Sequence, residues 1–179
     1  TAVVGTLGIG FPPPLGSDSE WSFWPSPNTT PDPVLLHRAL RDLRSQGAQG
    51  VAMEVSSIGL EQGRVNGVGF GAALFTNLSR DHLDFHGDME SYARAKQKLF
   101  AMPGLRHAVL NLDDVQGVQI SRMLAGSGVS RTAYSCSEGV ALRAGTENWI
   151  EAHDIGMSPA GTRFVVKGSW GEARVDSPM

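Results

Sequence analysis

Short apolar runs of strand length recur along the chain and are separated by segments with helical spacing. Residues 2–9, 51–55, 72–76 and 107–112 are rich in valine, alanine and leucine, and each is long enough for one strand. Strands that alternate with helices at these lengths are typical of a parallel sheet covered by helices. The pattern therefore predicts an α/β fold with a mostly parallel sheet.

The segments between these runs contain residues that typically begin and end helices. Asp32 can cap a helix, Pro33 suits its first position and Gly47 suits its end. A second helix is predicted from Asp88 through Phe100, where Pro103 and Gly104 follow, and a third over residues 114–124. These three helices are expected to cover the sheet.

Two regions depart from that alternation. Residues 11–28 contain five prolines and are predicted to be a loop. After Ser137 the pattern changes to short strands at 150–152, 162–167 and 173–175, separated by turn residues. These strands predict an antiparallel meander appended to the edge of the parallel sheet.

The expected domain organisation is a single α/β unit over residues 1–136, with residues 137–179 as its antiparallel subregion. Both ends of the chain resemble interruptions of a longer sequence: residues 2–9 begin like a strand entered midway, and the last residues follow directly on strand-like sequence. The chain is therefore expected to be part of a larger protein.

Composition and charge narrow the class of function. The 179 residues are 41% hydrophobic and 18% charged, which supports a folded core rather than disorder. The net charge of −3, without a basic run, argues against a dedicated nucleic-acid binder. No apolar run approaches the length of a membrane span. A single cysteine, Cys136, excludes an internal disulfide and a cysteine-based zinc site.

Polar side chains follow two of the predicted strands. Glu54 ends the apolar run 51–55, and Asn77 follows the run 72–76. Carboxyl ends of parallel strands meet at one edge of a sheet, which is where open α/β folds bind ligands. Glu54, Asn77 and the nearby His82 are therefore expected at one rim, although an isolated glutamate could equally be a solvated strand end.

Residues 81–88 hold a dense cluster of acidic residues and histidines. His82, Asp84 and His86 alternate, so on an extended segment all three could face one divalent cation. Equally, the acidic residues could cap the helix that begins at Asp88. Lys96, on the border of that helix's apolar stripe, could be an ordinary lysine whose stem covers the core.

Several blocks of the sequence agree in order and spacing with one known family, the Mur ligases. The blocks are Asn28-Thr29-Thr30-Pro31, Met53-Glu54-Val55-Ser56-Ser57 through Gly59-Leu60, Gln62 and Arg64-Val65, then Thr76 to Gly87 and Ala95-Lys96. The chain resembles this family over residues 1–125, and more loosely to its end. The resemblance is greatest to members that add the third residue to the peptide of UDP-N-acetylmuramic acid.

The resemblance implies a cytoplasmic, monomeric, ATP-dependent amide ligase of peptidoglycan synthesis. It would join a diamino acid, meso-diaminopimelate or L-lysine, to UDP-MurNAc-L-Ala-D-Glu through an acyl phosphate. No nucleic acid or membrane takes part. The residues that would hold the UDP-MurNAc-dipeptide are Asn28, Thr29, Thr30, Ser56, Gln62 and Arg64.

The resemblance also assigns residues to ATP and Mg²⁺. Asn77 would contact ATP, and Glu54 would bind the Mg²⁺ that accompanies it. His82 and Lys96 would serve a second Mg²⁺, with Lys96 as its N-carbamate. An ammonium repels a cation, whereas a carbamylated lysine presents anionic oxygens, the ligands that Mg²⁺ prefers. Carbamylation requires the neutral amine, which burial favours.

Two features depart from the family pattern. Ile58 stands where the family normally has histidine, and no Gly-x-x-Gly-Lys-Thr phosphate loop occurs in the 179 residues. The phosphate loop, the N-terminal UDP-binding domain and the C-terminal domain are expected outside this chain. The chain alone is therefore expected to be inactive.

Two other functions compete with the ligase. A metal-dependent hydrolase could be built on Asp81, His82, Asp84 and His86, but His107 and His153 are poorly placed to complete its ligand set. A non-catalytic UDP-sugar-binding module could describe the chain in isolation. ATP turnover by the full-length protein would separate the three.

Overall fold

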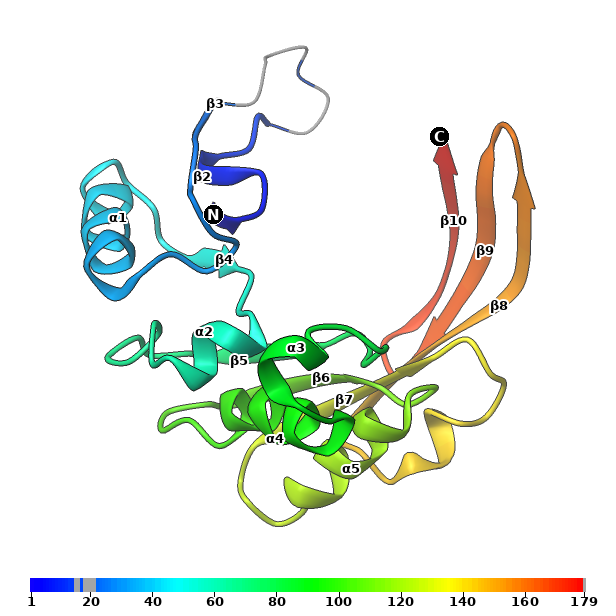
Figure 1. Ribbon diagram of the computed structural model, residues 1–179. Coiled ribbons are helices and arrows are strands. Elements are labelled where there is room, and N and C mark those ends of the chain that lie inside the picture. Colours follow the sequence, from blue (N-terminus) through cyan, green and yellow to red (C-terminus); the bar gives the residue numbers. More distant parts are fainter. Residues whose placement is uncertain (15–16, 18–21, 179) are drawn as a thin grey trace. The chain divides into compact units, whose positions relative to one another are not determined.

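The computed structural model describes residues 1–14, 17 and 22–178. These residues form two compact units, each drawn in Figure 1 with colours that follow the sequence. The first unit comprises Thr1–Val68 and His82–Leu99, and the second comprises Gly69–Asp81 and Phe100–Met179.

The first unit contains a four-stranded sheet that is partly antiparallel. Its first two strands form a hairpin whose turn is Thr6-Leu7, and its first and last strands pair in parallel. The strands in sheet order are β3 (Ser22–Trp24), β2 (Gly8–Phe11), β1 (Ala2–Gly5) and β4 (Val51–Met53).

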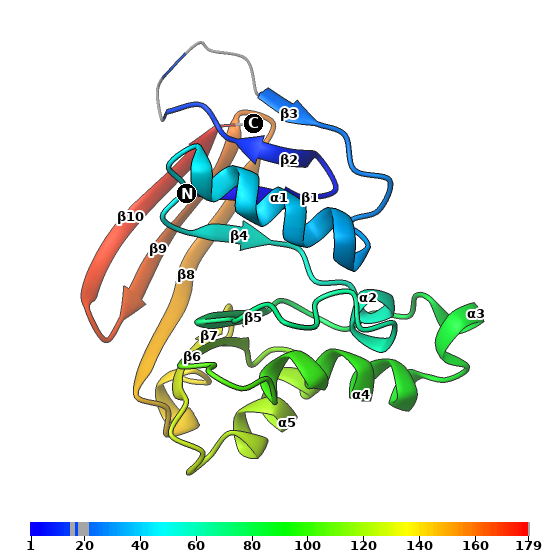
Figure 2. The same ribbon diagram turned by 90° about the vertical axis from the view of Figure 1, so that its left-hand side faces the viewer.

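The helix α1 (Pro33–Ser45) lies across this sheet (Figure 2). Its apolar stripe is buried, with Leu36 and Leu43 fully inaccessible to solvent. The Asp32 carboxylate accepts the N–H groups of Val34 and Leu35, both at 3.0 Å. These two N–H groups of the first turn have no partner within the helix, so Asp32 acts as the N-cap. The predicted helix and its cap are confirmed.

Three further helices follow α1 in the first unit. They are α2 (Ser57–Glu61), α3 (Leu83–His86) and α4 (Met89–Phe100). Asp88 precedes α4, and its carboxylate accepts the Ser91 N–H at 2.7 Å. That hydrogen bond lowers the pKa of the Asp88 carboxyl below its ordinary value. The predicted start of this helix is therefore confirmed.

The second unit contains a six-stranded sheet that changes from parallel to antiparallel. Its first four strands are parallel and its last three are linked by antiparallel hairpins, which form the long curved arm coloured orange to red in Figure 1. The strands in order are β5 (Ala72–Phe75), β6 (His107–Asn111), β7 (Ser130–Ser135), β8 (Asn148–Ser158), β9 (Gly161–Gly168) and β10 (Gly171–Pro178). The expected parallel sheet with an appended meander is confirmed.

The helix α5 (Val115–Met123) packs closely on β6 at Gly117. A Cβ atom added there would lie 1.8 Å from the Asn111 carbonyl oxygen and 3.4 Å from the Phe75 ring. No side chain fits at that distance, so glycine sets how near the helix axis comes to the sheet. A short 3₁₀ turn, η1 (Leu142–Ala144), precedes β8.

Parts of the predicted fold are wrong. The run 2–9 is a hairpin rather than one strand, because the chain reverses at Thr6-Leu7. The expected loop 11–28 contains β3, although residues 15, 16 and 18–21 lie outside the described part of the chain. The strand β7 was not predicted, since its sequence Ser-Arg-Thr-Ala-Tyr-Ser is mostly polar.

The expectation that Glu54 and Asn77 follow strands of the same sheet is wrong in the described residues. The strand before Glu54 is β4, in the first unit, whereas the strand before Asn77 is β5, in the second. Glu54 and Asn77 therefore do not share a sheet edge. Alternation of strands and helices identifies the strands, but pairing partners depend on long-range packing that a periodicity does not encode.

None of the helices in the described ranges is long and apolar enough to cross a bilayer.

Candidate functional site

The Thr30 side chain joins the loop before α1 to the turn before α2. Its hydroxyl donates to the Glu54 carbonyl oxygen at 3.0 Å and accepts the Ser56 N–H at 2.8 Å. Thr30 is fully buried. Both hydrogen-bonding functions of this hydroxyl are thus used within the protein, and they fix the backbone of residues 54–56.

Ser56 and Arg64 extend this network. The Ser56 hydroxyl caps α2 by accepting the Gly59 N–H at 3.0 Å. Arg64 donates from Nη1 to the Thr30 carbonyl oxygen at 2.9 Å and from Nε to Gln62 Oε1 at 2.8 Å. Five of the six predicted substrate residues therefore lie in or beside one hydrogen-bonded region of the first unit: Thr29, Thr30, Ser56, Gln62 and Arg64. Asn28, exposed, directly precedes them.

The Glu54 carboxylate is held by Thr6, a residue that the sequence reasoning missed. Glu54 Oε2 accepts the Thr6 hydroxyl at 2.6 Å and the Thr6 N–H at 3.2 Å. The Thr6 hydroxyl also lies 3.2 Å from that of Thr29. The turn of the β1–β2 hairpin thus fixes the direction of the carboxylate, which remains exposed. Nothing in the spacing of Thr6 and Glu54 signals this contact.

Gly5 leaves the space that the Glu54 side chain occupies. A Cβ atom on Gly5 would lie 2.7 Å from Glu54 Oε1 and 2.9 Å from Cδ. Such separations are not tolerated, so the carboxylate would have to move. The absence of a side chain at Gly5 is therefore part of how Glu54 is placed.

We expect Gly5→Ala to displace the Glu54 carboxylate and to lower the affinity of the full-length protein for Mg²⁺ about tenfold or more, as when a hydrogen-bonded ligand loses its supporting contact. The control is Gly50→Ala, because a Cβ atom there meets nothing within 4 Å. Steady-state rates over a range of Mg²⁺ concentration check this. Equal Mg²⁺ dependence in the two variants would contradict the role given to Gly5.

The Tyr92 ring contacts two of the three predicted metal residues, His82 and Lys96. Tyr92 is 5% exposed, and its ring packs edge-on against His82, with centroids 6.0 Å apart. The Lys96 ammonium lies 5.1 Å from the centroid of the same ring. The structure therefore brings His82 and Lys96 to one aromatic ring in the first unit. Both also make contacts beyond these.

The histidine cluster does not have the geometry first expected. Residues 83–86 form a helical turn, α3, rather than an extended segment, so His82, Asp84 and His86 do not alternate toward one point. His86 Nε2 instead lies 2.9 Å from Ser57 Oγ. Among the described residues, no three histidine, cysteine, aspartate or glutamate side chains form a group able to hold a metal. The expectation of a shared cation site on this segment is wrong.

A Mg²⁺ ion does not require such a group. It keeps several waters and takes one or two protein carboxylates together with substrate phosphates. The exposed, oriented carboxylate of Glu54 suits one such position. A carbamate on Lys96 would supply oxygen ligands of the same kind. The Glu54 carboxylate therefore suits Mg²⁺ that is bound together with substrate.

In the second unit, the carboxyl ends of β5, β6 and β7 are tied together. Asn111 Nδ2 donates to the Thr76 carbonyl oxygen at 2.7 Å, and Asp114 accepts the Leu78 N–H at 2.7 Å. Burial raises the pKa of the Asp113 carboxyl, but hydrogen bonds from Cys136 N–H and the Ser135 hydroxyl outweigh it, and that pKa is lowered. The exposed Asn77 lies on the loop that these contacts hold.

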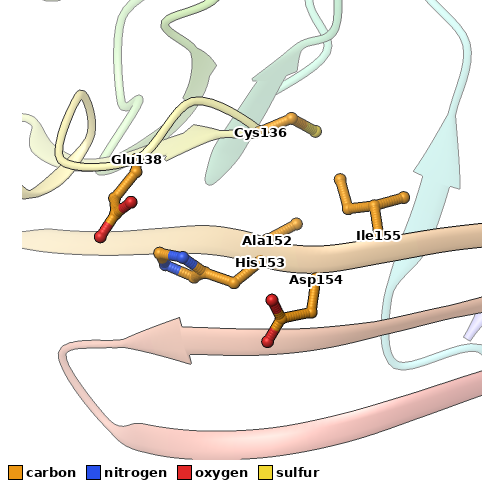
Figure 3. A pocket seen from close by; sticks show the side chains of 6 residues that line it. All are labelled: Cys136, Glu138, Ala152, His153, Asp154 and Ile155. Atoms are coloured by element: carbon orange, nitrogen blue, oxygen red, sulfur yellow. The ribbon is translucent and has the colours of Figure 1, made fainter.

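A hollow beside β8 is lined by Cys136, Glu138 and residues 152–155 (Figure 3). The side chains of Glu138 and His153 point toward one another there. The neighbouring Glu151 is buried, and its carboxylate accepts the N–H groups of Gly139 at 2.9 Å and Leu142 at 3.1 Å. Glu151 therefore anchors the loop before β8. The described residues of this hollow include no group able to hold a metal.

Comparison with known proteins connects this geometry to a family. A model of the Mur ligase middle domain matches residues 1–179. The UDP-N-acetylmuramoyl-L-alanyl-D-glutamate–2,6-diaminopimelate ligase of Ralstonia nicotianae is 47% identical over 180 residues, which are 99% of this chain and 33% of that protein. The ligase of the same name from Pseudomonas aeruginosa is 56% identical over 124 residues, 69% of this chain and 23% of that protein.

A solved structure of a ligase with this name agrees with the fold. Its TM-score is 0.79 at 36% identity, over 99% of this chain and 33% of that one. The chain thus spans about a third of the length of the relatives it matches (33% of the Ralstonia protein). Because the family model covers every residue, the chain belongs to the Mur ligases, as their middle domain.

Proposed function

We propose that this chain is the middle domain of an ATP-dependent amide ligase of peptidoglycan synthesis. The complete enzyme adds 2,6-diaminopimelate to UDP-MurNAc-L-Ala-D-Glu, in the cytoplasm and as a monomer. The observation that carries the proposal is the single hydrogen-bonded network that joins Thr30, Ser56 and Arg64 to Glu54. The names of the relatives support 2,6-diaminopimelate over L-lysine.

The network suggests how the UDP-MurNAc-dipeptide is held. Arg64 uses two of its N–H groups on Thr30 and Gln62, so its planar fork is fixed while further donors remain for an anion. A diphosphate or carboxylate of the substrate suits these donors. Asn28 and Thr29 offer polar side chains beside it, whereas the buried Thr30 acts by shaping the loop.

Glu54, His82 and Lys96 are proposed to serve Mg²⁺, with Lys96 as its carbamate. Bound Mg²⁺ would neutralise the phosphoryl group transferred from ATP to the D-Glu carboxylate. Glu54 is oriented for this task by Thr6. The Lys96 amine, half-buried against the Tyr92 ring, would gain two anionic oxygens on carbamylation. The acyl phosphate that forms is then attacked by the amine of the diamino acid.

Asn77 is proposed to contact ATP from the loop after β5. The phosphate loop that would cradle the nucleotide is not found among the 179 residues. Phosphoryl transfer depends on positioning and charge stabilisation, which backbone amides and the lysine of that loop normally provide. We therefore propose that residues 1–179 need the rest of the protein for catalysis.

Purified residues 1–179 are expected to neither hydrolyse ATP nor form an amide bond above the background rate. Coupled ADP release and mass spectrometry of the sugar nucleotide measure both reactions. The full-length protein, assayed in parallel, provides the positive control. Mg²⁺-dependent ligation by residues 1–179 alone would refute this prediction.

The proposed function is tested with the full-length protein, ATP, Mg²⁺ and UDP-MurNAc-L-Ala-D-Glu. With 2,6-diaminopimelate, the product is expected to gain the mass of one diamino acid residue, and with L-lysine the rate should be far lower. Cleavage of the sugar nucleotide without added amine would favour the metal-dependent hydrolase. Binding without turnover would favour a UDP-sugar-binding module.

A further inference from the structure

We infer that His86 is a positioning residue that couples the turn at Ser56 and Ser57 to the helix that carries Lys96. This inference rests on the proposed function, since it concerns the same site. His86 was a candidate metal ligand on the basis of its spacing. Its contacts assign it a different task.

The first contact fixes the start of α2. His86 Nε2 and Ser57 Oγ lie 2.9 Å apart. Ser57 is only 1% exposed, so its hydroxyl must find a partner inside the protein. A buried hydroxyl left without one costs about 1–3 kcal/mol. Ser57 follows directly on Ser56, the cap of α2, so the bond to His86 also restrains that cap.

The second contact fixes the position of His86 relative to α4. The imidazole stacks on the Tyr92 ring, with centroids 5.0 Å apart and 18° between the planes. The same ring packs against His82 and lies beneath the Lys96 ammonium. His86 therefore contacts two parts of the proposed site. Its Nε2 edge meets Ser57, beside the proposed substrate residue Ser56, and its ring face stacks on Tyr92, which contacts the proposed metal residues His82 and Lys96.

This arrangement predicts that the two halves of the site are energetically coupled. If Ser57 loses its partner, the Ser56 turn is freed from α3 and α4. If the imidazole is lost, Tyr92 loses its stacked neighbour, and the ring beneath the Lys96 ammonium is held less firmly. Removal of either side chain breaks the same contact between Ser57 and His86, so the effects of the two substitutions on substrate binding should not add.

The test is a double-mutant cycle in the full-length protein with Ser57→Ala, His86→Phe and both together. His86→Phe keeps a ring for Tyr92 and removes the nitrogen that meets Ser57. Each single variant is expected to raise the KM for UDP-MurNAc-L-Ala-D-Glu about tenfold, the equivalent of one buried hydrogen bond. The double variant should be no worse than the poorer single one.

Two further variants separate positioning from general stability. His86→Gln retains a side-chain N–H that can reach Ser57, and it is expected to return KM to within about threefold of the wild-type value. His37→Phe is the matched control, because His37 Nε2 makes an equal 2.9 Å contact, to the Asn66 carbonyl oxygen, elsewhere in the same unit. It should leave KM unchanged.

Calorimetric binding of UDP-MurNAc-L-Ala-D-Glu without ATP supplies a readout independent of turnover. Its Kd should rise about tenfold in Ser57→Ala and His86→Phe. Unchanged KM and Kd in Ser57→Ala, or multiplicative effects in the double variant, would overturn the inference. If His86→Phe does not fold, Ser57→Ala and His86→Gln decide it. Failure of the wild-type protein to ligate would instead overturn the proposed function.

Discussion

Lys96→Ala is expected to lower the kcat of amide formation by the full-length protein about 10²–10³-fold. This is the usual cost of removing one preorganised electrostatic contact from a site of phosphoryl or acyl transfer. The amine lies 5.1 Å from the Tyr92 centroid, on the ring that also packs against His82. Its proposed carbamate would be the anionic group at that point, and alanine cannot replace it. Initial rates of amide formation measure the loss.

The helix α4 offers a matched control for this variant. Lys98 lies two positions along, and its ammonium forms a 2.6 Å ion pair with Glu61 on the exposed side of the helix. Exposed pairs of this kind contribute little, so Lys98→Ala should retain nearly full activity. Short carboxylic acids such as formate or acetate should partly restore activity to Lys96→Ala, because they supply the missing oxygens. Full activity of unrescued Lys96→Ala would leave Lys96 as an ordinary lysine whose stem covers the core.

Gly117→Ala is expected to have the largest effect on stability among the single substitutions considered. The added methyl group would lie 1.8 Å from the Asn111 carbonyl oxygen, and this neighbour is backbone rather than a flexible side chain. The helix α5 would have to move away from β6. Overpacking of this kind costs about 1–3 kcal/mol in the free energy of unfolding. The change should appear as a lower midpoint in urea unfolding followed by the fluorescence of the protein.

Gly69→Ala is the control for this substitution. Gly69 also lies in the second unit, and a Cβ atom there meets nothing within 4 Å. It should leave the midpoint unchanged or raise it slightly, since alanine restricts the unfolded chain more than glycine does. Equal midpoints for the two variants would show that α5 can shift without cost.

Much of the fold could be predicted because its signals are local. The Asp32 cap, Pro33 and the leucine spacing of α1 act within a few residues of one another. The turn residues at 158–161 and 168–171 likewise mark where β8, β9 and β10 reverse. In both cases the chemistry of a short stretch determines the conformation of that stretch.

Pairing between distant segments could not be predicted. The strands β4 and β5 have similar apolar sequences, yet each belongs to a different sheet. The strand β7 is polar, and it is held by its neighbours β6 and β8 rather than by its own propensity. Which strands become neighbours depends on packing across the whole unit, and no periodicity in one segment contains that information.

The candidate site also contains residues that could be predicted from local sequence and residues that could not. Residues such as Glu54 and Arg64 stand in blocks whose order and spacing can be read along the chain. Thr6, which orients Glu54, and His86, which meets Ser57, are separated from their partners by many residues of intervening chain. Threonine and histidine have many ordinary uses, so only the folded geometry shows which of them support the site.

The measurement that tests the account most directly follows oxygen from substrate to phosphate. The full-length protein is supplied with ATP, Mg²⁺, 2,6-diaminopimelate and UDP-MurNAc-L-Ala-D-Glu carrying ¹⁸O in the D-Glu carboxylate that is to be joined. Activation as an acyl phosphate predicts one ¹⁸O in inorganic phosphate for every amide bond formed, with ADP as the other product. Label in AMP, or phosphate without label, would contradict it.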